Sequence, residues 1–238
     1  VHPTLGGVAR ETGALKRQRH APLVAALLGC GRRVAARYCA RVMDLLDGET
    51  LRARLQPGPL PPDDAAAVLE QVLEGLAVAH AAGVVHRDVK PGNILLVRDG
   101  GGPQAEAAAG AGAGAAGATR VVLLDFGLAR GGDAPGMTRT GAFLGTPEYV
   151  SPEQARAEKN VGPAADVYSA GIVLWEMLAG RPPFEGNSQV EILMAQAQRP
   201  LPPPRRALAV APGWLRDLAA WMLEKDPARR PADAGEAL

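Results

Sequence analysis

Three side chains that together could transfer a phosphoryl group lie close to one another in the stretch HRDVKPGNILL at positions 86–96. The carboxylate of Asp88 can orient a hydroxyl group and accept its proton, and the ammonium group of Lys90 can neutralise phosphate charge. The amide oxygen of Asn93 can bind Mg²⁺. Because the intervening proline lacks an amide donor and the glycine frees the backbone, the spacing predicts a loop and not a helix face. Phosphoryl transfer requires these groups.

Three more motifs follow this loop along the chain. DFG at 125–127 comes directly after the strand-like run VVLL at 121–124, and GTPEYVSPE at 145–153 and DVYSAG at 166–171 come later. In order and spacing, the motifs resemble the large lobe of a bacterial-type (eukaryotic-like) serine/threonine protein kinase, and the resemblance covers nearly the whole chain. The implied fold class is α+β, a protein-kinase-like two-lobe fold that consists here mostly of the helical large lobe with a truncated small-lobe sheet.

The resemblance implies a function and a role for each polar residue of these motifs. The function would be ATP-dependent phosphorylation of serine and threonine hydroxyls on protein substrates. Asp88 would be the catalytic carboxylate, Lys90 would neutralise charge on the moving phosphoryl group, and Thr146 would hydrogen-bond to both. Asn93 and Asp125 would hold the Mg²⁺ that bridges the phosphates, so ATP and Mg²⁺ are the expected cofactors. The lysine after the aspartate also favours serine and threonine over tyrosine as acceptors.

Arg87 directly precedes the catalytic carboxylate. In the family, this pattern accompanies control by phosphorylation of the activation segment, here residues 131–145. A phosphate group can bind a guanidinium group through two hydrogen bonds and order the segment. Thr138 and Thr140 are the candidate phosphorylation sites. The alternative is that both are ordinary solvated loop threonines.

Three residues have structural roles by the same resemblance. Glu153 and Arg230 match a pair that would form a buried ion pair between the activation segment and the turn after the penultimate helix. Asp166 stands at the start of an apolar helix that is predicted to continue to Leu178.

The N-terminal segment offers weaker matches for binding ATP. Glu11 lies nine residues before His20 and thereby matches the helix glutamate that pairs with the ATP-binding lysine. Met43 matches the gatekeeper residue, and the segment from Asp44 to Leu46 matches the hinge that binds adenine through its backbone. The alternatives are a solvated helix glutamate and an ordinary core methionine.

The chain divides into two expected parts. Residues 1–43 would be a remnant of the kinase small lobe, and residues 44–238 would be the large lobe. The alanine- and glycine-rich run at 99–119 cannot build a core, so it is predicted to be a flexible insertion. No glycine-rich loop and no strand lysine precede Glu11. We therefore expect the chain to be an excerpt of a kinase that by itself transfers little phosphate.

Two other functions compete with this interpretation. A pseudokinase or scaffolding module would explain the absent glycine loop, but not the intact Asp88, Lys90, Asn93 and Asp125. A small-molecule phosphotransferase of the aminoglycoside type would have glycine in place of Arg87 and would lack the SPE motif.

The elements that must position these residues can be predicted from periodicity and breakers. Asp63 or Asp64 is expected to cap a helix that ends near Ala82 at Gly83, and the stretch from Gly48 to Leu51 resembles the start of the preceding kinase helix. Further helices are predicted over 8–18, 166–178, 190–198 and 214–223, with another beginning at 232–238, and strands over 24–28 and 34–46, with a hairpin of 94–97 and 121–124.

Composition excludes several classes of protein. The chain has 238 residues and a net charge of +1, so it lacks the excess of basic residues that is typical of proteins that bind nucleic acids. No apolar run reaches about 18 residues, so no membrane span is expected. Cys30 and Cys39 lack metal-type spacing, which fits a reducing cytosol, and a cytoplasmic kinase domain is the expectation. The expected partners are proteins with phosphorylatable serine or threonine and, through the small lobe, a second kinase copy.

Overall fold

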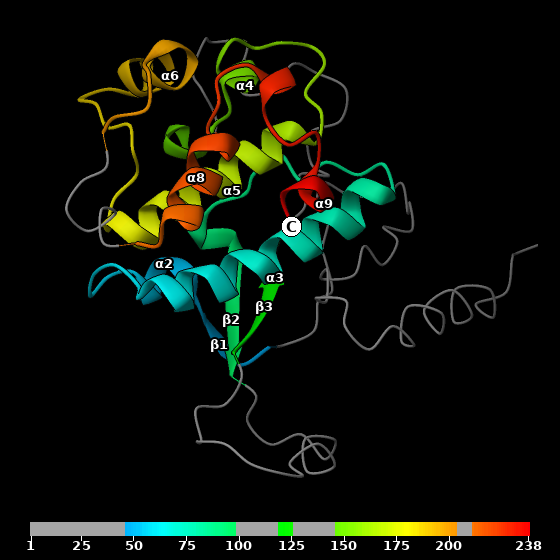
Figure 1. The fold of residues 1–238 in the computed structure, drawn as a ribbon, viewed down its shortest axis with the longest axis vertical. Helices are drawn as coiled ribbons and strands as arrows, with labels where there is room; N and C mark the ends of the chain where they lie inside the picture. The colour runs from blue at the N-terminus through cyan, green and yellow to red at the C-terminus, as the bar shows by residue number, and fades with distance from the viewer. Residues whose placement is uncertain (1–45, 99–118, 126–145, 204–210) are drawn as a thin grey trace, which may run out of the picture.

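The computed structural model describes residues 46–98, 119–125, 146–203 and 211–238. The expected small-lobe helix and strands therefore lie outside the described residues, apart from Leu46. Figure 1 shows a helical body with a small sheet on one side of a long central helix. The helices are α2 Leu51–Arg54, α3 Pro62–Ala81, α4 Pro152–Ala155, α5 Ala164–Ala179, α6 Gln189–Gln198, α8 Gly213–Met222 and α9 Ala234–Ala237. The strands are β1 Gly48–Thr50, β2 Ile94–Arg98 and β3 Thr119–Leu123, and the short 3₁₀ helices are η1 Pro91–Asn93, η2 Pro147–Tyr149 and η3 Pro227–Arg229.

The three strands form one antiparallel sheet in the order β1-β2-β3. Ile94 pairs with Leu123 and Leu96 pairs with Val121, so the predicted hairpin is confirmed. Thr119, which was assigned to the insertion, is the first residue of β3. The backbone N–H of Val121 donates to the side-chain oxygen of Gln71 on α3 at 2.9 Å, so α3 supplies an acceptor to a backbone donor of β3.

The expected helix does begin within the stretch 48–51, but only at its last residue, because Gly48–Thr50 form the strand β1. The helix begins at Leu51, where the hydroxyl of Thr50 accepts a hydrogen bond from the backbone N–H of Ala53 at 3.3 Å. At Gly48 the strand passes so close to β2 that an added Cβ atom would overlap with the carbonyl oxygen of Leu96. Only glycine fits this approach.

The long helix α3 begins at Pro62, so both aspartates lie inside the helix and neither can be its N-cap. The N-cap is Pro61 and no side chain caps the helix, so the predicted cap by Asp63 or Asp64 is wrong. Proline suits the first helical position, where its missing N–H costs nothing, and the two carboxylates lie in the first turn, where the helix dipole favours negative charge.

The C-terminal end of α3 confirms the prediction of a glycine stop. Gly83 has φ +73°. Its N–H donates to the carbonyl of His80 at 2.9 Å, and the N–H of Val84 donates to the carbonyl of Ala79 at 2.9 Å. These two bonds define a Schellman motif, which turns the chain toward the catalytic loop.

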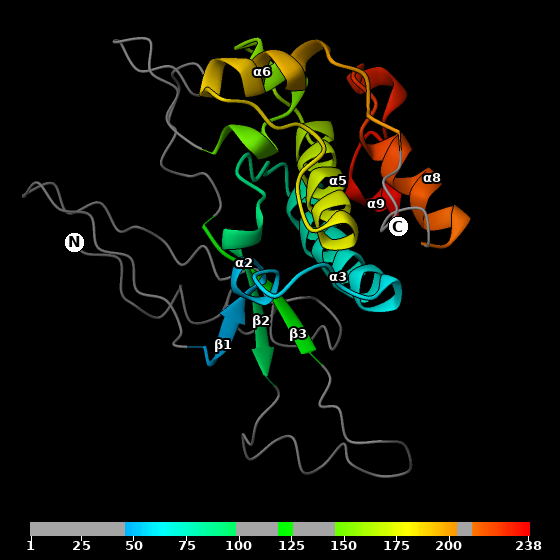
Figure 2. The ribbon, with the colours of Figure 1, turned by 90° about the vertical axis from the view of Figure 1, so that its left-hand side faces the viewer.

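Helix α5 is the centre of the hydrophobic core. Nearly all of its residues from Ala165 to Leu178 are buried, and the helix ends at Gly180 with φ +76°. Figure 2 shows α3 and α5 side by side, and Figure 1 shows the sheet on the far side of α3 from α5. Helix α8 packs against α5 at Gly171, where an added Cβ would lie 2.9 Å from the Cβ of Met222. The core therefore fixes α3, α5 and α8 relative to one another.

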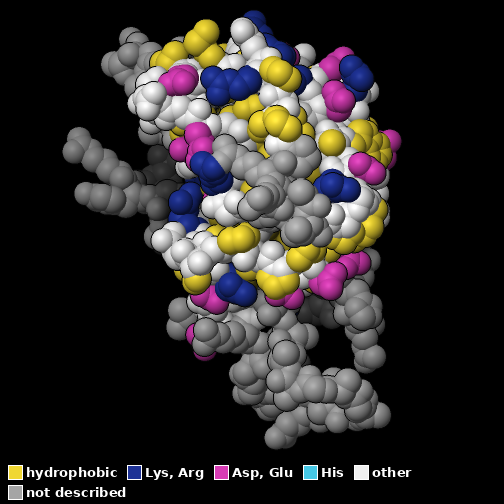
Figure 3. Space-filling model, turned by 60° about the vertical axis from the view of Figure 1, so that its left-hand side comes forward, with side chains coloured by type: hydrophobic (Ala, Val, Ile, Leu, Met, Phe, Trp, Pro, Cys, Tyr) yellow, Lys and Arg dark blue, Asp and Glu magenta, His cyan; other side chains and the backbone are white. Residues whose placement is uncertain are grey.

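One face of the described part of the molecule carries side chains of mixed character. On the face in Figure 3, acidic and basic side chains are interspersed with apolar ones over the described part of the surface. Among the described residues, no helix has the length and apolar character needed to cross a bilayer.

Candidate active site

The buried carboxylate of Asp166, in the first turn of α5, holds the backbone of the catalytic loop. It accepts hydrogen bonds from the N–H of His86 at 2.6 Å and from the N–H of Arg87 at 2.7 Å. A third bond, at 3.0 Å, comes from Nε2 of His80 on α3. Nδ1 of His80 accepts from the N–H of Ala234, so Nε2 carries the ring proton. A buried carboxylate needs such donors, and here they fix the loop between α3 and α5.

His86 joins the catalytic loop to the residue before the candidate metal ligand. Its Nε2 donates to the carbonyl of Leu124 at 3.0 Å, and its Nδ1 accepts from the N–H of Asp88 at 3.3 Å. Burial lowers the pKa of His86, although the charge of Asp166 opposes this effect. The ring is therefore neutral at pH 7, as its one acceptor and one donor nitrogen require.

The loop brings Asp88, Lys90 and Asn93 together, as the sequence predicted. Nζ of Lys90 donates to both carboxylate oxygens of Asp88, at 3.0 and 2.8 Å. Nδ2 of Asn93 donates to the backbone carbonyl of Asp88 at 2.8 Å and to its Oδ2 at 2.9 Å. The side chain of Asp88 is 33% exposed, so a substrate can reach a carboxylate that two neighbours hold in place.

The two candidate metal ligands lie at the same end of the β2–β3 hairpin. Asn93 immediately precedes β2, and the N–H of Leu124, just after β3, donates to the carbonyl of Asn93 at 2.8 Å. The exposed Asp125 follows with φ +53°. In this register Ile94 lies opposite Leu123. It therefore brings Asn93 and Asp125, which are 32 positions apart in the sequence, to the same end of the hairpin.

Arg87 adopts φ +65°, a left-handed conformation that non-glycine residues seldom adopt. Asp166 binds its N–H, and Nε2 of Gln154 donates to its carbonyl at 3.1 Å. The backbone is therefore held on both sides. Nε of Arg87 is buried, and within the described part of the chain it has no hydrogen-bond partner.

The segment before α4 is attached to α5 by one tyrosine. The hydroxyl of Tyr149 donates to Glu176 at 2.6 Å, and the hydroxyl of Ser169 donates to the carbonyl of Tyr149 at 2.7 Å. Burial raises the pKa of both Tyr149 and Glu176. Among the described residues, no hydrogen bond joins Thr146 to Asp88 or to Lys90, so the role of Thr146 stays a prediction.

The predicted ion pair between Glu153 and Arg230 is confirmed. Nη2 of Arg230 lies 2.6 Å from Oε2 of Glu153, and both side chains are buried. Nη1 of Arg230 donates to the carbonyl of Ala164 at 2.7 Å. The pair thus joins α4, the start of α5 and the turn at η3.

A second polar cluster attaches α6 to η2. Nζ of Lys225 donates to the hydroxyl of Tyr168 at 2.7 Å and to the carbonyl of Gln196 at 2.8 Å, and it lies 3.9 Å from the ring centroid of Phe184. The side chain of Gln196 accepts from Tyr168 and donates to the carbonyl of Glu148 in η2. Burial lowers the pKa of Lys225 to about 7, and nearby arginines act in the same direction.

Comparison with known proteins assigns a family to this geometry. The family model described as protein kinase domain matches residues 4–238. The chain belongs to the protein kinase family. This confirms the resemblance found in the motifs and the mixed α+β fold class, and family membership implies the use of ATP.

Among the proteins similar to this kinase domain are bacterial serine/threonine kinases. It is 42% identical over 200 residues to serine/threonine-protein kinase PkaA of Streptomyces coelicolor, and the alignment covers 84% of this chain and 33% of that protein. It is 42% identical over 194 residues to PknL of Mycobacterium tuberculosis, covering 81% of this chain and 44% of that protein. It is 37% identical over 232 residues to serine/threonine-protein kinase pkn2 of Myxococcus xanthus, in an alignment that covers 95% of this chain and 26% of that protein. The chain spans less than half the length of each of these relatives.

The oxygen atoms of Asn93 and Asp125 at the end of the β2–β3 hairpin are suitable ligands for Mg²⁺. The amide nitrogen of Asn93 makes both bonds to Asp88, which leaves its amide oxygen out of them. That oxygen and the carboxylate of Asp125 are hard ligands of the kind that Mg²⁺ prefers. In the described part of the chain, no group of three or more His, Cys, Asp or Glu side chains could hold a metal ion.

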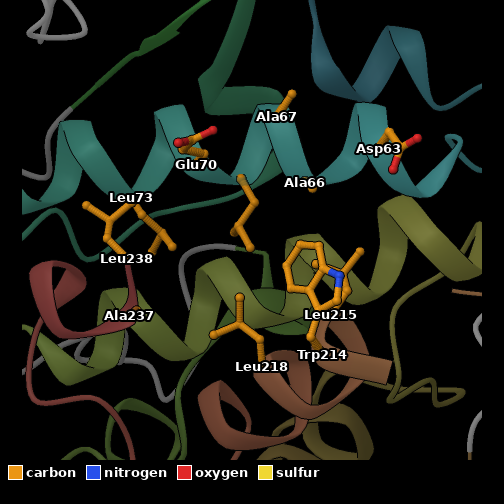
Figure 4. Close-up of a pocket in the computed structure, with 11 residues that line it drawn as sticks. Asp63, Ala66, Ala67, Glu70, Leu73, Trp214, Leu215, Leu218, Ala237 and Leu238 are labelled. Atoms are coloured by element: carbon orange, nitrogen blue, oxygen red, sulfur yellow. The ribbon is translucent and has the colours of Figure 1, made fainter. Parts of the chain in front are cut away.

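A pocket of about 420 Å³ lies between α3 and α8, beside α9. Figure 4 shows Trp214 and Leu218 of α8 facing α3 across this pocket, with Leu238 at one end. None of the candidate catalytic residues lines it, so the pocket is not part of the active site.

Several predicted site residues lie outside the described residues, namely Glu11, Met43, Asp44, Thr138 and Thr140. Leu46 is described, half-buried and outside helices and strands, so its place in the hinge stays a prediction.

The sequence interpretation missed four residues that position the site. His80, His86 and Glu176 were not named as site residues, and neither was Gln154. Two of them had a local sequence signal: His86 is the first residue of the stretch HRDVKPGNILL, and Ser151 precedes Gln154 by three residues in the spacing of a capping box.

Proposed function

We propose that this kinase domain transfers the γ-phosphoryl group of ATP to serine and threonine hydroxyls of protein substrates. The arrangement of Asp88 supports the proposal most strongly. Its carboxylate is partly exposed and bonded by Lys90 and Asn93, in a loop whose backbone is fixed by the buried Asp166. Such a loop would be of little use to a scaffold without catalysis.

The chain's own residues would act mainly by positioning. Because the transition state of phosphoryl transfer is loose, the orientation of the hydroxyl matters more than the strength of the base. Asp88 would orient the substrate hydroxyl and accept its proton. The ammonium group of Lys90 lies 2.8 Å from the same carboxylate, so a phosphoryl group that reaches Asp88 meets a positive charge.

Asn93 and Asp125 would hold Mg²⁺ through oxygen atoms at the edge of the sheet. The ion would supply positive charge against the phosphates of ATP. The hydrogen bond between the N–H of Leu124 and the carbonyl of Asn93 sets the spacing of the two ligands. Thr146 would complete the site from the substrate side, next to η2.

Phosphoamino acid analysis tests the proposed reaction. The full-length protein would be incubated with ATP labelled at the γ position and a generic basic protein. We expect label in phosphoserine and phosphothreonine. Label only in phosphotyrosine would contradict the substrate class, and the absence of any label would contradict the function.

Arg87 is proposed to bind a phosphorylated residue of the activation segment. Its buried Nε lacks a partner within the described part of the chain, and a phosphate group offers several acceptor oxygens. Thr138 and Thr140 are the proposed acceptors.

The regulatory proposal predicts occupied sites in active enzyme. Mass spectrometry of the full-length protein after incubation with ATP should find phosphate on Thr138, Thr140 or both. Alanine at both positions should lower the rate, since the segment then lacks the charge that orders it. Fully active enzyme without phosphate at either threonine would refute the proposal.

A further inference from the structure

The side chain of Gln154 connects two parts of the kinase domain that are far apart in sequence. It lies on α4 and is 5% exposed. Its Oε1 accepts from the N–H of Ser151 at 3.1 Å, and its Nε2 donates to the carbonyl of Arg87 at 3.1 Å. In return, the backbone N–H of Gln154 donates to the hydroxyl of Ser151 at 3.3 Å. The same amide therefore completes a helix cap and reaches the catalytic loop.

The carbonyl that Gln154 binds belongs to the peptide group that joins Arg87 to Asp88. Arg87 has φ +65°, which the backbone keeps only where surrounding bonds enforce it. Asp166 binds the N–H groups of residues 86 and 87 from the side of α5. Gln154 supplies the opposing bond, on the carbonyl, from the side of α4. The orientation of this peptide plane sets the direction in which the Asp88 side chain leaves the backbone.

We propose that Gln154 is a positioning residue for Asp88, through which the substrate-side segment at 146–153 is coupled to the catalytic carboxylate. The inference rests on the proposed function. The adjacent residue has another task, because Glu153 pairs with Arg230 and fixes α4 to the turn at η3. Because α4 is fixed in this way, the bond from Gln154 to Arg87 fixes the catalytic loop relative to α4.

An amide is required at this place because one side chain must accept one bond and donate another. A carboxylate at position 154 could still accept from the N–H of Ser151 but, when ionised, could donate nothing to the carbonyl of Arg87. When protonated, it could donate again. The variant Gln154→Glu therefore separates the bridge to the catalytic loop from the cap of α4.

The test is steady-state kinetics of the full-length protein between pH 6 and pH 8. At pH 8, we expect Gln154→Glu to lower kcat by about tenfold or more, since small displacements of a catalytic group have effects of this size. The KM for ATP should change by less than about threefold, because Gln154 does not contact the metal ligands. The ratio of variant to wild-type kcat should rise as the pH falls, since burial at this position raises the pKa of a carboxyl group and protonation restores the donor.

Ser151→Ala is the matched control, because it removes the hydroxyl of the cap and leaves the bond from Gln154 to Arg87. It should lower the melting temperature and keep kcat within about threefold of the wild type. If Gln154→Glu does not fold, Gln154→Met takes its place, with a similar loss of kcat and no recovery at low pH.

Two results would overturn the proposal. One is a kcat of the position-154 variant within about twofold of wild type at every pH. The other is an equal loss of kcat in Ser151→Ala, which would assign the effect to the cap. Failure of the proposed function would look different, because the wild-type protein would then transfer no phosphate.

Discussion

The carboxylate of Asp166 is buried, yet each of its oxygens has a hydrogen-bond donor. An unpaired charge in this place would cost several kcal/mol. An acidic residue in an otherwise apolar helix therefore indicates buried partners, and the sequence did single out Asp166. It could not identify the partners, because two of them are backbone N–H groups of a loop some 80 positions earlier.

Lys225 illustrates a residue that no local pattern could assign. Its acceptors are the hydroxyl of Tyr168 and the carbonyls of Ala195 and Gln196, which come together only in the fold. Its pKa is lowered from 10.5 to about 7, mainly by burial. At pH values between about 7 and 10.5, Lys225 is protonated in the unfolded chain but deprotonated in the folded one. The contribution of Lys225 to the free energy of unfolding therefore rises with pH in this range.

Lys225→Met removes this titration. We expect the free energy of unfolding of the wild type, relative to the variant, to increase as the pH rises from about 7 toward 10. Urea unfolding of both proteins at pH 6.5, 8 and 9.5 measures the difference. Parallel stability curves over this range would contradict the lowered pKa.

At the scale of elements, the predictions that succeeded rest on strong local rules. Gly83 ends α3 with positive φ, and the hairpin of β2 and β3 has the predicted pairing. The two failures have physical reasons. A three-residue strand such as β1 has no period to detect, and the proline at the start of α3 replaced a capping aspartate.

The contact between α5 and α8 predicts a steric effect at Gly171. In Gly171→Ala the new Cβ would lie 2.9 Å from the Cβ of Met222 and 3.2 Å from side-chain carbons of Leu223. We expect a loss of about 1–3 kcal/mol in the free energy of unfolding, because the packed helices must separate slightly.

Gly162→Ala is the matched control, since an added Cβ there meets nothing within 4 Å. It should change the free energy of unfolding by no more than about 0.5 kcal/mol, or raise it, because alanine restricts the unfolded chain. Chemical denaturation compares the two variants. Equal effects of both substitutions would show that the contact is not tight.

The ion pair of Glu153 and Arg230 predicts a large effect when one partner is removed. Glu153→Gln or Arg230→Met should each cost about 3–5 kcal/mol, because the other charge stays buried. The double variant should cost less than the sum of the two. Urea unfolding of the three variants measures this coupling, and single losses below about 1 kcal/mol would show that the pair is not buried in solution.

At the scale of the whole molecule, the active site combines the end of α3, the catalytic loop, the β2–β3 hairpin and the start of α5. The sequence motifs were sufficient to name Asp88, Lys90 and Asn93 and the family. They could not give the bonds among these segments, such as the one from the N–H of Leu124 to the carbonyl of Asn93, because such bonds depend on the relative positions of helices and strands.

The central claim is that the carboxylate held in the catalytic loop carries out phosphoryl transfer. Asp88→Asn keeps the shape of the side chain but removes the oxygen that accepts the substrate proton. In the full-length protein, we predict that kcat for a basic protein substrate falls by about 10²–10⁴-fold. The melting temperature and the affinity for Mg·ATP should stay close to the wild type. Asp217→Asn, on an exposed part of α8, is the matched control and should keep full activity. If Asp88→Asn retained activity within about tenfold of the wild type, the assignment of the active site would be wrong.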